Sequence, residues 1–182
     1  MPDDIEIMRI IREKFREDDP SALELTYEHF GKRIYGYLVS MLRSASDAEE
    51  ILNELFLSIA RKREQVLKAS NIRTYLFGMA RNLAFDMFRK RTSQKQALTS
   101  YAEYLELRED SENWNEEELD AVGKAVDSLP EEQREVVVLK IFEEMTFEEV
   151  AELLRISQNT AASRYRYALE KLKEQLKGFG YE

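Results

Sequence analysis

A segment rich in both cations and aromatic rings, at 73–91, carries chemistry of its own. Five cations are interleaved with four rings in RTYLFGMARNLAFDMFRKR: Arg73, Tyr75, Phe77, Arg81, Phe85, Phe88, Arg89, Lys90 and Arg91. Rings stack on unpaired bases and cations neutralise backbone phosphates, so this mixture suits a nucleic-acid strand whose bases are exposed. The alternative is that most of the rings belong to a hydrophobic core and the charges only solvate a surface.

A second candidate lies at 147–172, in FEEVAELLRISQNTAASRYRYALEKL. Thr146 and Glu149 have capping-box spacing, and Ser157 can cap a following helix. The short turn at 155–157 between two amphipathic helices is typical of a helix-turn-helix. The outer face of the second helix carries side chains that can donate to phosphates or bases: Gln158, Asn159, Ser163, Arg164, Arg166, Tyr167 and Lys171. An ordinary helical hairpin with a polar outer face remains the alternative.

The sequence contains no pattern that is typical of a catalytic site. A carboxylate-rich helical bundle could hold two iron ions, but such sites need Glu-x-x-His pairs. The only histidine, His29, has Thr26 three positions before it. A glycine-rich phosphate loop and a Ser/His/Asp arrangement are also missing from the sequence. The sequence therefore predicts a protein with no catalytic residues, no metal site and no cofactor, which is not an enzyme.

The charge of the chain is segregated. The formal net charge is -9, yet residues 61–95 contain ten basic and two acidic residues, a net +8. Residues 96–135 contain thirteen acidic and three basic residues, a net −10. This asymmetry predicts a local nucleic-acid footprint beside an acidic segment with another task.

The remaining composition bears on location. The chain has no cysteine, which excludes disulfides and cysteine zinc sites and suits an intracellular protein. The acidic start MPDDIEIMRI does not resemble a signal peptide, and the apolar run IYGYLVSML at 34–42 is too short to span a bilayer. We expect a cytoplasmic protein without membrane insertion.

The elements that position these segments are helices. Only 6 Gly and 3 Pro interrupt long stretches of helical periodicity, so the fold is predicted to be all-α. We expect two small helical domains, 1–95 and 119–182, joined by an acidic linker at 96–118. In the first domain, the break at 19–21 separates two helices, Ser46 or Asp47 caps the next, and Asn71 caps the helix through 91. In the second, four short helices end in the helix-turn-helix.

Three segments together resemble a known family: DAEEILNELFLSIAR at 47–61, NIRTYLFGMARNLAFDMFRKR at 71–91 and LPEEQREVVVLKIFEEMTFEEVAELLRISQNTAASRYRYALEKL at 129–172. In order and spacing they are similar to a bacterial RNA polymerase sigma factor of the small two-domain extracytoplasmic-function (ECF) group. The likeness covers nearly everything from 21 to 176. It implies a transcription initiation factor that binds core RNA polymerase and directs it to promoters.

The resemblance also implies residue roles. The segment 47–61 would dock on the clamp helices of the polymerase β′ subunit through Asp47, Glu50, Asn53, Glu54 and Phe56, and the β flap is a further expected contact. The −10 promoter element would be recognised and melted by Arg73, Tyr75, Arg81, Asn82, Asp86, Arg89, Lys90 and Arg91. The −35 element would be read by Ser157, Gln158, Asn159, Thr160, Ser163, Arg164, Arg166, Tyr167 and Lys171. The acidic linker would mimic nucleic acid in a basic polymerase channel, and an anti-sigma factor is an expected further partner that no residue identifies.

Some positions depart from the family pattern. Asn53 stands where Gln is usual, and Arg155 replaces a Gly in the turn, where a left-handed conformation would cost strain. Ala162, Tyr165 and Tyr167 replace residues that are commonly basic, small aliphatic and Arg. We expect recognition of −35 DNA to be weak, unusual in sequence, or carried by Arg164, Arg166 and Lys171.

Two other classes of protein compete with this interpretation. A helix-turn-helix regulator that binds duplex DNA by itself would use its N-terminal domain for dimerisation or ligand sensing. The aromatic residues of 73–91 favour melted DNA, which such a regulator does not need. A module that binds only proteins would leave the +8 segment unexplained.

Overall fold

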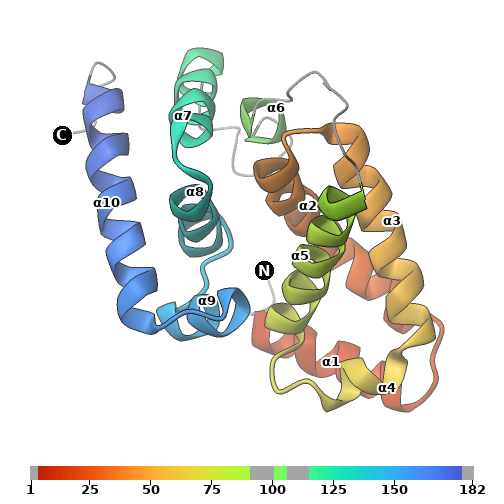
Figure 1. Ribbon diagram of the computed structural model, residues 1–182. Helices are drawn as coiled ribbons and strands as arrows, with labels where there is room; N and C mark the ends of the chain where they lie inside the picture. Colours follow the sequence, from red (N-terminus) through yellow and green to blue (C-terminus); the bar gives the residue numbers. More distant parts are fainter. Residues whose placement is uncertain (1–3, 91–100, 106–114, 178–182) are drawn as a thin grey trace. The chain divides into compact units, whose positions relative to one another are not determined.

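The computed structural model describes residues 4–90, 101–105 and 115–177, and these residues form helices and no strand (Figure 1). The prediction of an all-α fold is confirmed. The chain divides into two compact units, of which the first comprises 1–35 and 46–94 and the second comprises 36–45 and 95–182. Each unit has its own hydrophobic core.

The first unit is built from α1 (Asp4–Arg16), the first part of α2 (Ser21–Leu42), α3 (Ala45–Arg61), α4 (Arg63–Lys68) and α5 (Ile72–Lys90). Apolar residues at helical spacing turn one side of each helix inward. The core consists of residues that are almost fully buried: Ile11 and Phe15 from α1, Phe30 and Ile34 from α2, Leu55 and Ile59 from α3, and Leu76, Phe77 and Ala80 from α5.

The helix boundaries of this unit follow local hydrogen bonds. Asp19 accepts a bond from the Ser21 backbone N–H at 2.9 Å at the start of α2, and Lys14 pairs with its carboxylate at 2.7 Å. The bond from Lys14 and those from Ser21 lower the pKa of Asp19 to about 2. Asn71 accepts a bond from the Thr74 N–H at 3.2 Å, which confirms the predicted cap of α5.

One predicted cap in the first unit is wrong. Helix α3 begins at Ala45, so Ser46 and Asp47 lie inside its first turn. Asp47 there is only 8% exposed. A capping side chain must precede the helix, and both candidates come too late for that role.

The second unit contains α6 (Tyr101–Leu105), α7 (Glu116–Ser128), α8 (Glu131–Val137), the π-turn η2 (Val138–Phe142), α9 (Phe147–Leu154) and α10 (Gln158–Leu176). Helix α10 packs beside α7, α8 and α9 (Figure 1). Helix α6 falls within 96–118, the segment predicted as the linker. It buries Tyr101 and Tyr104 and approaches α7 so closely that a Cβ on Gly123 would collide with the backbone of Ala102.

The corner between α7 and α8 is held by a buried cation. The Arg134 guanidinium donates to the carbonyl oxygens of Asp127 at 3.1 Å and Leu129 at 3.4 Å. Burial is the main cause that lowers the pKa of Arg134 from its ordinary value. Because these bonds join the two helix ends, they fix the direction in which α8 leaves the corner.

Within the described ranges 4–90, 101–105 and 115–177, no helix combines the length and apolar character that a membrane span needs. The same residues include no group of three or more His, Cys, Asp or Glu side chains placed to hold a metal ion.

Candidate polymerase and nucleic-acid interfaces

Helix α3 presents a polar and partly apolar outer face. Ala48, Ile51, Leu55 and Ile59 are buried, and this stripe turns Glu50, Asn53 and Glu54 to the solvent. Two of the predicted docking residues are instead mostly buried, Asp47 at 8% and Phe56 at 9% exposure. Of the predicted docking residues, the exposed ones are therefore the carboxylates of Glu50 and Glu54 and the amide of Asn53.

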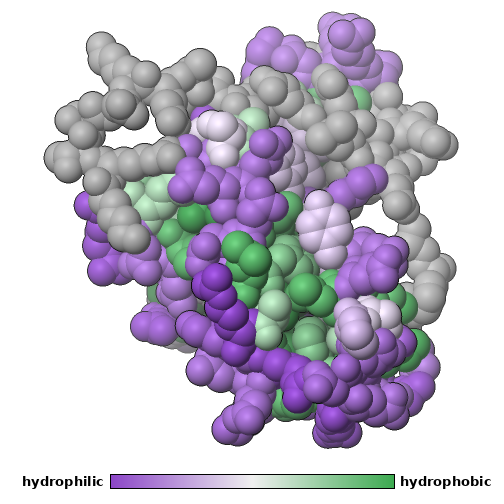
Figure 2. All heavy atoms as spheres, turned by 90° about the vertical axis from the view of Figure 1, so that its right-hand side faces the viewer, coloured by the Kyte–Doolittle hydropathy of each residue, from purple (hydrophilic) through white to green (hydrophobic). Residues whose placement is uncertain are grey.

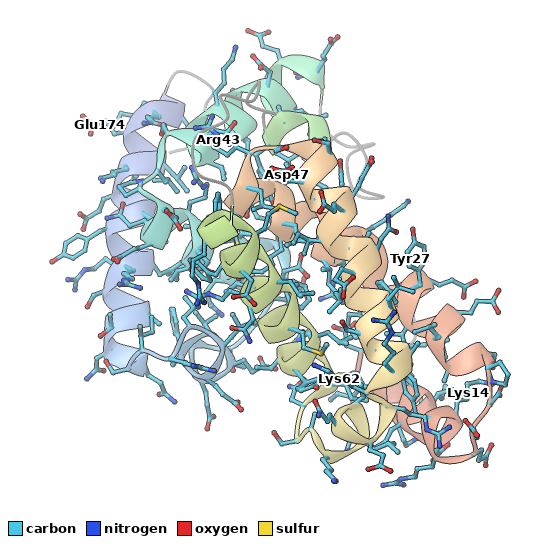
Figure 3. The ribbon with its side chains drawn as sticks, turned by 45° about the vertical axis from the view of Figure 1, so that its right-hand side comes forward. Lys14, Tyr27, Arg43, Asp47, Lys62 and Glu174 are labelled. Atoms are coloured by element: carbon cyan, nitrogen blue, oxygen red, sulfur yellow. The ribbon has the colours of Figure 1, made fainter. Side chains whose placement is uncertain are left out.

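An apolar patch adjoins this face. Tyr27 of α2 is 53% exposed, and its ring meets the edge of Phe56 with centroids 5.0 Å apart. Leu57, the next residue along α3, is 52% exposed. Hydrophobic side chains gather in the middle of the face that carries α3, with hydrophilic ones around them (Figure 2). Figure 3 shows Tyr27 beside α3, whose two ends are marked by Asp47 and Lys62.

The sequence analysis missed Tyr27 and Leu57 as surface residues. Tyr27 falls on the helical stripe through Leu23 and Phe30, which predicts burial. The ring lies against its own helix, where a Cβ on Gly31 would be at ordinary contact distance from it, so this glycine is not required for the placement. The local sequence gives no sign that Tyr27 is exposed.

Helix α5 carries rings and cations on its accessible side. Arg81 lies over the ring of Phe85, 4.5 Å from its centroid, and Phe88 is 47% exposed. Asn82 is exposed, as are Asp86 and Arg89, which form an ion pair at 3.1 Å. The predicted combination of cations and stackable rings is thus present from Arg81 to Arg89. Lys90 ends α5 without a described side chain, and Arg91 lies outside the described residues.

Tyr75 lies on another part of α5 and is half-buried. Its hydroxyl donates to the Gln65 side-chain oxygen at 3.3 Å. Burial raises the pKa of Tyr75, so the phenol stays a neutral donor at ordinary pH. The ring is anchored to α4 and not open on both faces.

Arg73 occupies a different environment from the other cations of α5. It is only 9% exposed and pairs with Asp4 of α1 at 3.2 Å. The same carboxylate accepts from Arg33 at 3.1 Å and contacts His29 Nε2 at 2.9 Å. Burial acts to raise the pKa of Asp4, but the charge and hydrogen bonds of Arg33 and the bond from His29 outweigh it and hold the pKa below its ordinary value. Asp4 of α1 therefore joins Arg73 at the start of α5 to Arg33 and His29 of α2.

The helix-turn-helix is formed by α9 and α10. The capping box of Thr146 and Glu149 is confirmed, with the Glu149 N–H donating to Thr146 at 3.2 Å and the Thr146 N–H to Glu149 at 2.7 Å. Ser157 caps α10 by accepting from the Thr160 N–H at 3.0 Å. Arg155 in the turn takes the left-handed conformation, with φ 56° and ψ 46°. That conformation favours glycine, so Arg155 is held in it by the turn.

Helix α10 separates a buried stripe from a polar face. Ala161, Ala168 and Leu172 are buried at helical spacing and form its inner stripe. Tyr165 on the same side is half-buried, and Leu169 is 38% exposed. The predicted DNA-facing residues are exposed or half-buried: Ser157, Gln158, Asn159, Thr160, Ser163, Arg164, Arg166, Tyr167 and Lys171. Arg166 lies over the Tyr167 ring, 5.0 Å from its centroid.

Arg164 is bound to another helix. Its Nη2 lies 2.6 Å from Oε2 of Glu132 on α8. At the far end of α10, the Ser128 hydroxyl donates to Gln175 at 2.9 Å. The sequence analysis missed Glu132, because a carboxylate 32 residues away in the sequence gives no local sign of the pairing.

Two segments of the chain, one for most of each unit, match known families. Residues 26–94 match the family described as Sigma-70 region 2, and residues 119–172 match Sigma-70, region 4. The first match includes α3 and α5, and the second includes α8, α9 and most of α10.

Full-length relatives and solved structures agree with these matches. The ECF RNA polymerase sigma factor RpoE of Cereibacter sphaeroides is 26% identical over 173 residues, covering 94% of each chain. The RNA polymerase sigma factor CarQ of Myxococcus xanthus is 28% identical, covering 90% of this chain and 94% of its own. The fold is similar to that of CnrH, solved in complex with the cytosolic domain of CnrY, with a TM-score of 0.68 at 20% identity over 94% of this chain and 98% of the other.

Proposed function

This chain belongs to the bacterial sigma-70 family, in its ECF group, and on that premise we propose how it divides the work of starting transcription. As a sigma factor it is a promoter-directing initiation factor that binds core RNA polymerase and promoter DNA, and not an enzyme. The finer proposal is that α3 docks on the polymerase, α5 opens the −10 element and α10 reads the −35 element. The domains with these tasks are 1–95 and 119–182.

Docking is assigned to the outer face of α3 and the apolar patch beside it. Glu50, Asn53 and Glu54 supply carboxylate and amide groups, and Tyr27 and Leu57 supply exposed apolar surface. An interface needs apolar anchors within a polar rim, and this face offers both. The partner would be the β′ clamp helices of the polymerase, and we place the β flap against the second unit.

Melting of the −10 element is assigned to α5, and the observation that carries it is the run from Arg81 to Arg89. Phe85 is half-buried under Arg81, and Phe88 is largely open. An exposed ring can stack on a base that has left the duplex, and the neighbouring cations can neutralise its phosphates. Arg73 contributes by fixing the start of α5 to α1 and α2.

Reading of the −35 element is assigned to α10. Its capped N-terminus lies next to a turn that carries the exposed Arg155, and its outer face offers amide, hydroxyl and guanidinium donors. A recognition helix uses such groups on base edges and phosphates in the major groove.

Two further partners complete the proposal. The acidic segment 96–118 would line a basic channel of the polymerase. Because α6 packs on α7 in the free chain, this use requires α6 to leave α7. RpoE of Bartonella quintana was solved in complex with the anti-sigma factor NepR, and its fold is similar to this one with a TM-score of 0.62 at 20% identity, over 79% of this chain and 89% of that one. We propose an anti-sigma partner for this chain too.

Reconstituted transcription tests the proposal. Core polymerase with the full chain should start transcripts at a specific set of promoters, which core alone does not use. The double variant Asn53→Ala with Glu54→Ala should reduce transcription through weaker polymerase binding, and excess protein should restore it. If the variant's affinity for core enzyme is unchanged, the docking face is misassigned.

A further inference from the structure

The ion pair between Arg164 and Glu132 links the recognition helix to the helix packed behind it. Arg164 Nη2 and Glu132 Oε2 are 2.6 Å apart, and the Arg164 side chain is 25% exposed while that of Glu132 is 70% exposed. The carboxylate is therefore at the surface, and the guanidinium is partly enclosed. Such a pair adds little to stability by itself, so its effect on the direction of Arg164 matters more.

Arg164 lies at the border between the inner and outer faces of α10. It follows the buried Ala161 by three residues and precedes the buried Ala168 by four, which places it at the edge of the inner stripe. A long side chain there can lie along α8 or extend past it to the surface. The bond to Glu132 holds it at the side of α8.

The backbone position of Glu132 is set by its helix. It lies in the first turn of α8, after Pro130, and the helix N-terminus favours a carboxylate at this place. The buried Arg134 fixes the corner from which α8 starts. Glu131 shares the first turn and the same charge, but successive residues differ by about 100° around a helix, so it has a different direction.

We infer that Glu132 is a positioning residue that determines how selectively Arg164 reads the −35 element. This inference rests on the proposed function of α10. A guanidinium has five N–H donors in one plane, so a carboxylate on one side leaves donors free for the acceptors of a base. An arginine already held in one direction loses less freedom on binding and meets a misplaced base with worse geometry.

The inference predicts opposite effects on affinity and selectivity. Replacing Glu132 by Gln removes a negative charge close to the DNA-binding face, which should raise affinity for any duplex. It also replaces the charge-assisted bond to Arg164 by a weaker neutral one, which should lower discrimination between the preferred −35 sequence and its single-base variants. A pair that only ties α8 to α10 would give neither the selective loss nor its dependence on Arg164.

The test uses holoenzyme made from core polymerase and the full chain, on one promoter that it transcribes and a series of single-base changes in its −35 element. Glu132→Gln should reduce the preference for the unchanged promoter by about fivefold at the Arg164-dependent position, equivalent to about 1 kcal/mol. Glu131→Gln, the matched control, should raise general affinity but keep the preference. Glu132→Asp, which keeps the charge, should retain more of the preference than Glu132→Gln.

Two results would overturn the inference. One is an equal preference in Glu132→Gln and Glu131→Gln. The other is a loss in Glu132→Gln that persists when Arg164 is already replaced by Gln. If wild-type holoenzyme initiates at no promoter, the proposed function itself fails, which is distinct from both results. Should Glu132→Gln not fold, Glu132→Asp against wild type decides the question by the same preference ratio.

Discussion

Helices α5 and α10 have the same length, 19 residues each, and carry different chemistry. On α5, a cation lies over a half-buried ring and another ring is open to solvent. On α10, amides and hydroxyls dominate the outer face beside the capped N-terminus. Aromatic rings stack on unpaired bases, whereas amide and hydroxyl groups donate hydrogen bonds to the edges of paired bases. The two helices are therefore suited to different contacts with the same promoter.

The helices also differ in how their arginines are held. Arg73 of α5 is buried and pairs with the partly exposed Asp4, and this carboxylate connects three helices of the first unit. Arg164 of α10 is bound to an exposed glutamate at the surface. When a buried charge loses its partner, the unpaired charge destabilises the fold. A surface pair adds little stability, so its main effect is on the direction of the side chains that form it.

Replacement of Phe88, the exposed ring on α5, should have the largest effect on transcription initiation. Phe88→Ala removes a stacking surface worth about 1–3 kcal/mol per base, so initiation at a duplex promoter should fall by about tenfold to a hundredfold. On a promoter with a pre-melted −10 element the loss should be much smaller. Tyr167→Ala on α10 is the matched control and should not distinguish the two templates. Equal losses on both templates would remove the proposed difference between the helices.

Arg164 should affect the other element. Arg164→Gln should lower transcription from promoters that need the −35 element by about tenfold, since a base-reading arginine contributes about 1–3 kcal/mol. Promoters that depend only on the −10 element should be unaffected, and so should binding to core polymerase. Weaker polymerase binding would show that Arg164 has a different role.

Asp4 should affect stability more than transcription. Asp4→Asn removes the negative charge that faces Arg73 and Arg33 and one of the two oxygens that accept their bonds, and we expect the first unit to lose about 1–2 kcal/mol, measured by urea denaturation at neutral pH. The folded pKa of Asp4 is lower than the ordinary value of an unfolded aspartate, so its contribution is present above that ordinary value and disappears as the pH falls through the lower folded pKa. Wild type and variant should therefore converge in acid. Glu6→Gln, on the exposed pair with Arg9, should change stability little. A variant as stable as wild type would make the pair of the buried Arg73 on α5 no different in stability from the surface pair on α10.

Arg155 should give the smallest effect. Arg155→Gly relieves the left-handed conformation, although the more flexible unfolded chain offsets part of the gain, so we expect about 0.5 kcal/mol of added stability. Binding to −35 DNA should weaken slightly because one cation beside the recognition helix is lost. A variant that is less stable than wild type would show that the Arg155 side chain makes stabilising contacts.

Local rules predicted much of this structure. The capping box at Thr146, the caps at Ser157 and Asn71 and the inner stripe of α10 depend on residues a few positions apart, which the sequence displays directly. The family resemblance and its order of segments were confirmed by the matches to Sigma-70 region 2 and Sigma-70, region 4.

Pairings between distant residues could not be predicted. The sequence predicts a surface position for Arg73, because its partner Asp4 lies 69 positions earlier. Helix α6 has five residues, too few to form alone, so only its packing on α7 makes part of the acidic segment helical. Tyr27 has the spacing of a core residue and is exposed because the helix around it is only partly covered.

Binding of labelled full-length protein to core RNA polymerase, in competition with a housekeeping sigma factor, is the decisive experiment for a sigma factor. We expect tight binding that the competitor displaces, and weaker binding by the Asn53→Ala, Glu54→Ala variant. If the protein does not bind core enzyme and the free protein binds a specific duplex, it is instead a helix-turn-helix regulator that acts alone.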